Sequence, residues 1–297
     1  MIQVKDLYKS FDGFAALSGL NIHVPRGAVY GLVGPNGAGK STVIRHLAGV
    51  YRQDRGEVLI GGEPVYENPA VKAKIACIPD EIFYFNSASI RDMKDFIRSM
   101  IPAFSDERFE KLREAFPLDE KQPVRRLSRG MQKQAAFWIA LSCCPEVLLL
   151  DEPVDGLDPV MRRQVWSLLL QDVAERGTTV LVSSHNLREL EDVCDHVGIM
   201  DRGHMFLEKA LSDMQENTVK IQLALPDDRA LPADLDILHE TQTGRLRQLI
   251  LRGKAEELTA KLAACEPLFM DVLPLSLEEI FIYELGGEDH EIKNILL

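Results

Sequence analysis

Residues 34–41 read Gly-Pro-Asn-Gly-Ala-Gly-Lys-Ser, a pattern that restricts the local fold to a glycine-rich loop between a strand and a helix. Glycines carry no Cβ, so successive backbone N–H groups can point into one concavity, and a helix starting there adds its positive N-terminal dipole. An apolar run at 29–33 precedes the loop, and a helical pattern at 42–47 follows it. The segment therefore predicts a phosphate-binding loop in which Lys40 supplies a cation and Ser41 a ligand for Mg²⁺.

Two other interpretations of this loop explain less. A glycine-rich turn that binds nothing accounts for the glycines but not for the strand and helix around them. A dinucleotide-binding loop needs the spacing G-x-G-x-x-G, which is missing, and leaves Lys40 unexplained. We expect nucleotide phosphates to contact Gly34, Pro35, Asn36, Gly37, Ala38, Gly39, Lys40, Ser41 and Thr42.

Two carboxylates, Asp151 and Glu152, directly follow the apolar run at 147–150. A buried parallel strand is apolar throughout, so these acids are expected at its carboxyl end, where the phosphate loop also opens. Adjacent side chains on a strand diverge, which allows different roles. Asp151 is expected to hold Mg²⁺ through water and Glu152 to orient or deprotonate the attacking water. Alone, the two acids could merely end the strand; the loop upstream favours the catalytic interpretation.

Alternating strand and helix patterns predict an α/β fold, a P-loop ATPase core with a mostly parallel sheet. The opening segment alternates with a turn at 12–13, which predicts antiparallel strands over 2–24. No convincing strand occurs between 83 and 141, so a helical insertion is expected there. Further strands are expected at 74–78, 146–150, 179–183 and 197–200, and a helix with one apolar face follows residue 158.

The domain boundary is expected near residue 215, which divides the chain into two domains, 1–215 and 216–297. The second is predicted to be a small α+β domain with strands at 219–225, 235–240, 246–251 and 268–272 and a helix at 255–264. Ser276 and Glu279 have capping-box spacing, which predicts a last helix.

Composition excludes several classes of protein. No apolar run reaches the length of a membrane span, and the N-terminus lacks the pattern of a secretion signal. The net charge is −12, and the chain from residue 211 onward holds 17 acidic against 8 basic residues. This bias opposes nucleic acid as a partner. Five cysteines without C-x-x-C spacing indicate reduced thiols, so a cytoplasmic location is expected.

With these motifs in this order, residues 1–210 resemble the nucleotide-binding subunit of ABC transporters. The segment Leu127-Ser128-Arg129-Gly130-Met131 resembles the signature of that family, Leu-Ser-Gly-Gly-Gln, and departs from it at Arg129 and Met131. The resemblance implies that Ser128 and the start of its helix receive phosphate oxygens of an ATP held by the opposite subunit. Without the family, an ordinary capped helix would explain Ser128.

Further positions match the family. Asp158 stands in a segment that resembles the D-loop, which contacts the opposite subunit; an Asp-Pro helix start is the simpler alternative and can coexist. His185 ends a predicted strand at the place of the switch histidine that reaches the γ-phosphate, although a lone histidine is more often structural. Phe11 matches the aromatic residue that stacks on adenine, with Tyr8 as its competitor.

One departure concerns the metal. The family usually places Gln after the strand ending at 78–79, where it senses Mg²⁺ and couples to the membrane subunit, and this chain has Asp80. An ionised carboxylate can ligate Mg²⁺ but cannot donate a hydrogen bond. The resemblance implies ATP and Mg²⁺ as cofactors, with Ser41, Asp151 and Asp80 as metal ligands.

The resemblance also implies partners: a membrane-embedded ABC permease, and a second cassette in a homodimer or a heterodimer with a paralogue. The chain looks like a bacterial antibiotic or multidrug exporter ATPase, peripheral to the cytoplasmic face of the cell membrane. The alternatives are a soluble ABC ATPase outside transport and a phosphate-loop kinase. The first predicts a second cassette, a coiled coil or a basic surface, and the second lacks the signature and His185.

Overall fold

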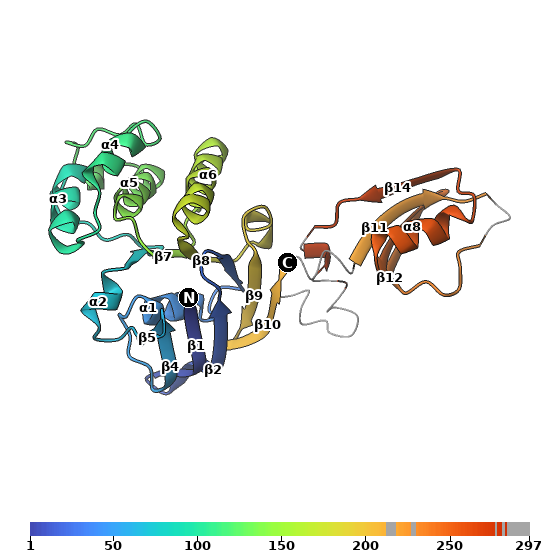
Figure 1. The fold of residues 1–297 in the computed structure, drawn as a ribbon, viewed down its shortest axis with the longest axis horizontal. Coiled ribbons are helices and arrows are strands. Elements are labelled where there is room, and N and C mark those ends of the chain that lie inside the picture. Colours follow the sequence, from blue (N-terminus) through green and yellow to red (C-terminus); the bar gives the residue numbers. More distant parts are fainter. Residues whose placement is uncertain (212–217, 227–229, 277, 281–282, 284–297) are drawn as a thin grey trace. The chain divides into compact units, whose positions relative to one another are not determined.

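The computed structural model describes residues 1–211, 218–226, 230–276, 278–280 and 283 (Figure 1). The chain forms two compact units. The first unit holds Met1–His185 and Val193–Glu208, and the second unit holds Asn186–Asp192 and Lys209–Leu297. The boundary expected at residue 215 falls in the segment 212–217, which lies outside the described residues.

A six-stranded sheet in the order β10-β9-β3-β8-β7-β6 forms the centre of the first unit. Strands β6, β7, β8, β3 and β9 run parallel, so their carboxyl ends meet at one edge. Every residue of β3 and β7 is buried, which explains why both are continuous apolar runs. The bounds are β3 Val29–Val33, β6 Ile75–Ile78, β7 Val147–Asp151, β8 Thr179–Ser184, β9 His196–Asp201 and β10 His204–Ala210. The predicted α/β architecture is confirmed.

A second, antiparallel sheet has the order β2-β1-β4-β5. The predicted hairpin of β1 (Ile2–Phe11) and β2 (Phe14–Val24) turns at Asp12 and Gly13, both at positive φ. Strands β4 (Arg55–Ile60) and β5 (Glu63–Pro64) complete the sheet and were not predicted. The apolar faces of both sheets share one core with helix α1 (Lys40–Leu47), which therefore lies buried between them.

The helical insertion between 83 and 141 has the expected character. Figure 1 shows α3, α4 and α5 grouped on the side of the parallel sheet away from β1, β2 and β4. Ser89 and Asp92 form a capping box at the start of α3, and the Phe109 ring of α4 stacks on Trp138 of α5 with 4.4 Å between centroids. Besides α1, the helices of the first unit are α2 Pro69–Lys72, α3 Ile90–Met100, α4 Asp106–Leu112, α5 Arg129–Ser142 and α6 Pro159–Arg176, with a 3₁₀ turn at Val124–Arg126.

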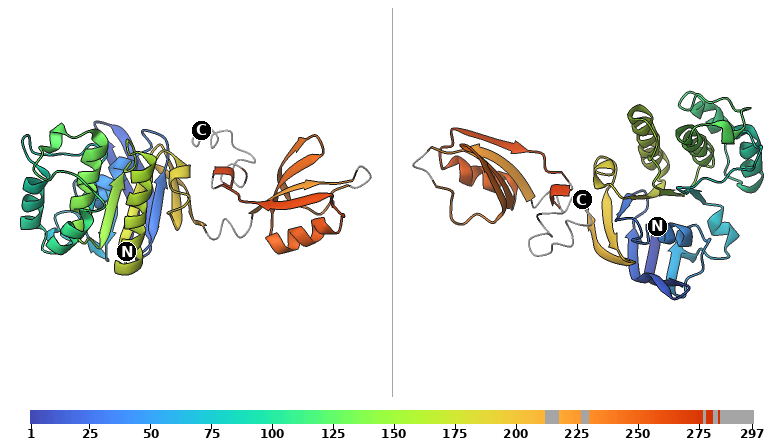
Figure 2. Two further views of the ribbon diagram at one scale, coloured as in Figure 1. Left: turned by 90° about the horizontal axis from the view of Figure 1, so that it is seen from above. Right: turned by 180° about the vertical axis from the view of Figure 1, so that it is seen from behind.

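The second unit contains an antiparallel sheet in the order β12-β13-β11-β14, with helix α8 against one face (Figure 2). The bounds are β11 Thr218–Ala224, β12 Ile237–Thr243, β13 Leu246–Arg252, α8 Ala255–Ala263 and β14 Phe269–Leu273, and a 3₁₀ turn spans Leu187–Glu189. Apolar residues of β11 and β13 pack under Leu258 and Leu262 of α8. The predicted capping box is present, since Ser276 Oγ accepts from the Glu279 N–H and the Glu279 carboxylate accepts from the Ser276 N–H. Most of the last predicted helix lies outside the described residues.

Candidate nucleotide-binding and catalytic site

The glycine-rich loop joins β3 to α1 at the carboxyl edge of the parallel sheet. Gly39, the N-cap of α1, has φ +104°, a conformation that side chains disfavour. A Cβ at Gly34 would lie 2.3 Å from the Met200 carbonyl oxygen, so only glycine fits there. The Lys40 ammonium donates to the carbonyl oxygens of Gly34 (2.6 Å) and Pro35 (3.3 Å). The loop thus holds a buried cation beneath the open N-terminus of a helix, which suits a phosphate.

Helix α1 is buried behind the loop and carries a histidine. The His46 side chain is 1% exposed, and its Nδ1 lies 2.7 Å from the Thr42 carbonyl oxygen. Burial lowers the pKa of His46, because desolvation disfavours the imidazolium. The neutral ring donates from Nδ1 to that carbonyl, which supports the first turn of the helix.

A cavity of about 460 Å³ opens above the loop. Residues 35–42 form its floor, the rings of Phe11, Phe14 and Tyr51 form one wall, and Asp80 and Glu152 reach it from the sheet edge. The ring centroids of Phe11 and Tyr51 lie 5.2 Å apart in an edge-to-face contact, so these two rings pack against each other. Among the described residues that line the cavity, Phe11 is present and Tyr8 is not. A polar floor with aromatic rings beside it matches the chemistry of a nucleotide.

Two residues of the cavity, Phe14 and Tyr51, were not predicted. Phe14 follows the turn of the first hairpin, and no pattern separates it from an exposed hairpin residue. Tyr51 stands after α1, outside any motif, and reaches the cavity because the chain returns beside the loop. For Tyr51, the one signal in the sequence is an aromatic residue a short distance after the loop.

Asp151 and Glu152 stand where the sequence predicted, at the end of β7. The Asp151 carboxylate is buried and accepts a hydrogen bond from Ser183 Oγ at 2.6 Å. Ser183 lies directly opposite Asp151 in the parallel pairing of β7 and β8, and its Oγ also accepts the Glu152 N–H at 3.1 Å. One buried hydroxyl therefore orients both the carboxylate and the following peptide.

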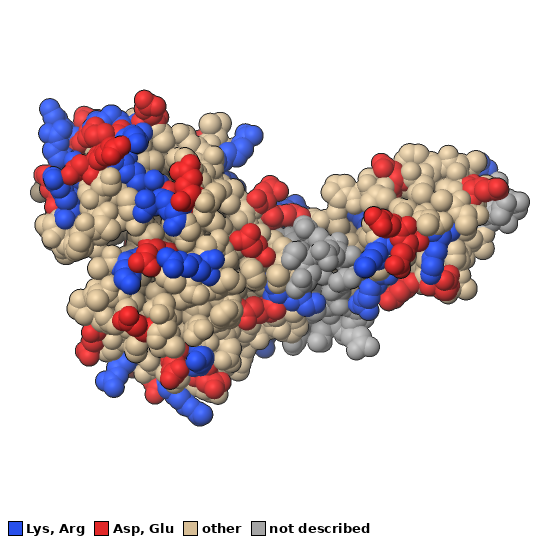
Figure 3. All heavy atoms as spheres, viewed as in Figure 1, with Lys and Arg blue, Asp and Glu red and all other residues tan. Residues whose placement is uncertain are grey.

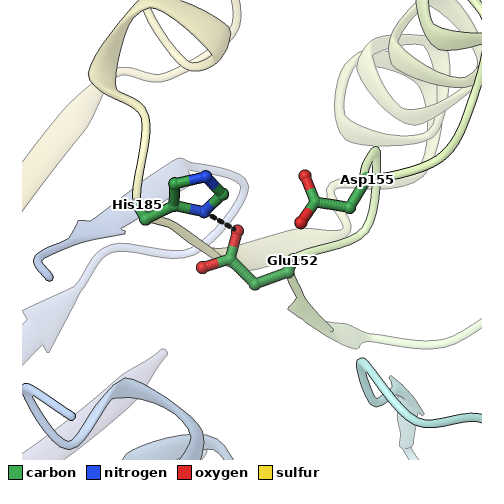
Figure 4. Close-up of side chains that lie close together, drawn as sticks. All are labelled: Glu152, Asp155 and His185. Carbon is green, nitrogen blue, oxygen red and sulfur yellow. Dashed lines mark hydrogen bonds and ion pairs between the residues drawn. The ribbon is translucent and has the colours of Figure 1, made fainter. Parts of the chain in front are cut away.

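The Glu152 backbone is strained, with φ +45° at a residue that has a side chain. Its carboxylate lies between two basic groups: Oε1 is 3.5 Å from Lys40 Nζ, and Oε2 is 3.0 Å from His185 Nδ1 (Figure 4). Asp155 joins this group, since ligand atoms of Glu152, Asp155 and His185 all lie within 4.8 Å of one another. These three side chains form an acid–base cluster at the edge of the nucleotide cavity and could hold a divalent cation.

Other predicted residues lie away from the cavity. Ser128 caps α5, with its Oγ accepting the Met131 N–H at 3.3 Å, and Asp158 caps α6 by accepting the N–H groups of Val160 and Met161. None of the five signature residues, nor Asp158, is among the described residues that line the nucleotide cavity. Arg129 instead lines a separate polar hollow of about 490 Å³ with Asp80 and Asp155. Within one chain, the structure brings together the loop, the strand-end acids, His185, Asp80 and Phe11, but not the signature.

The loop, the buried lysine and the strand-end carboxylates at the edge of a parallel sheet define a P-loop nucleoside triphosphatase. The family described as ABC transporter matches residues 17–155. The ABC transporter ATP-binding protein YtrB of Bacillus subtilis is 30% identical over 289 residues, which cover 97% of this chain and 99% of that protein. The chain belongs to the ATP-binding subunits of ABC transporters, so it is an ATPase that binds nucleotide.

Other relatives and solved structures support the same family assignment. The bacitracin transport ATP-binding protein BcrA of Bacillus licheniformis is 29% identical, with 97% of this chain and 98% of that protein covered. An ATP-binding subunit of an ABC transporter has TM-score 0.68 and 26% identity over 72% of this chain and 92% of its own. A dimeric cassette bound to ADP and phosphate has TM-score 0.63 and 22% identity over 71% of this chain and 99% of its own, a likeness of fold.

These findings confirm the transporter interpretation over a soluble ATPase or a kinase. ATP-binding subunits of this family work with membrane permease components. In the described part of this chain, we find no helix both long and apolar enough to cross a membrane.

Proposed function

We propose that the chain hydrolyses ATP in a Mg²⁺-dependent site shared by two cassettes and so powers a membrane permease. The observation that carries this proposal is the separation of the site into two parts. The phosphate loop and Glu152 line one cavity, whereas Ser128 and the N-terminus of α5 lie outside it. A second cassette would present its own Ser128 helix to the nucleotide on this loop, with a homodimer or a paralogous heterodimer as the assembly.

The site residues predicted from the sequence have proposed roles. Residues 34–42 and Lys40 bind the phosphates, and Phe11 stacks on the base. Glu152 orients or deprotonates the attacking water, and His185, hydrogen-bonded to Glu152, reaches the γ-phosphate.

The residues present also fit Mg²⁺. The Ser41 hydroxyl and the Asp80 carboxylate line the cavity, and Asp151 lies buried at the same sheet edge, so the donors are hard oxygen atoms of the kind Mg²⁺ prefers. When bound, the ion supplies positive charge to the β- and γ-phosphate oxygens. Asp151 is buried and is not among the described residues that line the cavity, so it would act through the water shell of the ion.

The proposed permease contact is an aromatic patch formed by Phe83, Phe85 and Phe96. Phe83 is 72% exposed, and the rings meet edge to face in series at 5.7 and 5.0 Å. The patch follows Asp80 in sequence and continues onto α3, so it stands in the chain between a cavity residue and the helical insertion. An apolar segment on the cytoplasmic side of a permease is the partner that this surface suits.

The proposed direction of transport is export, at the cytoplasmic face of the membrane. Its support is the kind of cargo in two relatives' names: the lantibiotic transport ATP-binding protein SrtF of Streptococcus pyogenes is 31% identical, and the bacitracin transport ATP-binding protein BcrA is 29% identical. On the face drawn in Figure 3, Lys and Arg side chains alternate with Asp and Glu, so the described residues there form no continuous basic surface for nucleic acid.

The test compares Glu152→Gln with the wild type and with Lys40→Ala as a control that loses phosphate binding. We expect Glu152→Gln to bind ATP, to hydrolyse it at least about tenfold more slowly, and to shift from monomer to dimer mass with ATP and Mg²⁺. Hydrolysis at the wild-type rate would show that Glu152 is not the base. A mass that does not change with ATP would exclude the homodimer, and the second cassette would then be sought as a paralogue.

A further inference from the structure

Lys133 is a buried lysine to which the proposed function gives no role. It lies in the second turn of α5, is 6% exposed, and joins two segments other than its own helix. Its Nζ donates to the Glu152 carbonyl oxygen at 2.6 Å and lies 3.7 Å from Asp80 Oδ1. A buried ammonium is costly unless it is paired and hydrogen-bonded, so these two contacts specify where the side chain ends.

The contact with Glu152 acts on its strained backbone. The Glu152 N–H donates to Ser183 Oγ at 3.1 Å, and its carbonyl accepts from Lys133, so the polar groups on both sides of the Cα are held. Rotation about either backbone angle would break one of these two bonds. A left-handed backbone at a residue with a side chain persists when its surroundings hold it in this way. The direction of the Glu152 carboxylate, toward Lys40 and His185, follows from that backbone.

We propose that Lys133 is a positioning residue for ATP hydrolysis: it fixes the Glu152 backbone, and Asp80 orients its ammonium group. The proposal rests on the proposed role of Glu152 as the base. Lys133 is not among the described residues that line the nucleotide cavity, so it does not touch the nucleotide there. Since α5 begins at the signature, a displacement of α5 or of the Asp80 segment reaches Glu152 through this one side chain.

The experiment uses the full chain and two neutral variants of similar length. Lys133→Met removes the donor, whereas Lys133→Gln can still donate to the Glu152 carbonyl. We expect Lys133→Met to lower kcat by about tenfold, the value of one lost hydrogen bond to a charged group, with the Kd for ATP within about twofold of wild type. Lys133→Gln should retain most of the activity. Lys121→Met, at an exposed lysine of the same insertion, is the control and should leave both constants unchanged.

A second pair of measurements separates positioning from a general structural effect. In a Glu152→Gln background, Lys133→Met should lower the residual rate by less than about twofold, because its effect passes through the missing carboxylate. An equal fall in both backgrounds, a wild-type kcat in Lys133→Met, or a parallel rise in Kd would each overturn the proposal. If Lys133→Met does not fold, Lys133→Gln decides, since a tenfold loss there would refute the donor role. Normal hydrolysis by Glu152→Gln alone would instead refute the proposed base.

Discussion

Replacing Ser183 with alanine should remove the hydroxyl that joins the two carboxylate positions proposed for metal binding and catalysis, Asp151 and Glu152. Ser183 is fully buried; its Oγ donates to Asp151 at 2.6 Å and accepts the Glu152 N–H at 3.1 Å. The variant leaves a buried carboxylate without its donor, at about 1.5–3 kcal/mol, and an N–H without its acceptor, at about 1–3 kcal/mol. With partial relaxation, we expect the free energy of unfolding of the first unit to fall by about 3 kcal/mol.

The assay is urea denaturation followed by tryptophan fluorescence. The chain has 2 tryptophans, Trp138 and Trp166, and both lie in the first unit, so the signal reports that unit alone. The kcat for ATP should fall at least about tenfold, because Glu152 loses one of the two bonds that hold its strained backbone.

The control for this prediction is Ser142→Ala, which removes another fully buried hydroxyl. Ser142 Oγ donates to the Trp138 carbonyl oxygen at 2.7 Å within α5, away from the site. It should cost about 1 kcal/mol and leave kcat unchanged. If Ser183→Ala costs no more than this control and hydrolyses ATP at the wild-type rate, the hydroxyl does not organise the site.

Three further predictions concern other parts of the first unit. Gly130→Ala should lower its stability by about 1–3 kcal/mol in the same urea assay, because the new Cβ would lie 2.7 Å from the Gly156 carbonyl oxygen; an unchanged midpoint would contradict this. Burial lowers the pKa of His46, so below about pH 6.5 the unfolded chain binds more protons than the folded chain. The free energy of unfolding therefore decreases as the pH is lowered, by up to about 1.4 kcal/mol per pH unit. His46→Phe should flatten that slope between pH 6.5 and 5, and an unchanged slope would assign it to other groups. Phe85→Ser with Phe96→Ser should leave the ATPase of the isolated chain unchanged and abolish its stimulation by a reconstituted permease; stimulation that survives would place the contact elsewhere.

The sequence was informative where a function requires consecutive residues. The glycine-rich loop needs its glycines in one run, since the backbone of each approaches the same ligand, and Asp151 with Glu152 needs a buried strand directly before it. These patterns predicted the parallel sheet, its carboxyl edge and the loop that forms the floor of the cavity. The first hairpin and the strands of the second unit were predicted for a similar reason, as their alternation is local.

Residues that meet through tertiary structure were harder to predict. Tyr51 and Phe14 enter the cavity because two separate segments pass the loop, and neither stands in a motif. Strands β4 and β5 were missed because β4 reads as a short charged segment whose partner, β1, lies about fifty residues earlier. Pairing of that kind depends on the assembled sheet and not on local preference.

The least predictable part of the site is the backbone of Glu152. The position of Glu152 follows from the apolar run before it. The direction of its side chain depends on a left-handed φ that no local sequence favours at glutamate. That conformation is held from outside by a hydroxyl on β8 and an ammonium on α5, two elements that the chain reaches 31 residues later and 19 residues earlier. A carboxylate whose backbone is held by two neighbouring elements can respond to the displacement of either one. With Glu152 in its proposed role as the base, this strained backbone is a physical route by which movements of α5 or β8 alter hydrolysis without altering the residues proposed to bind ATP.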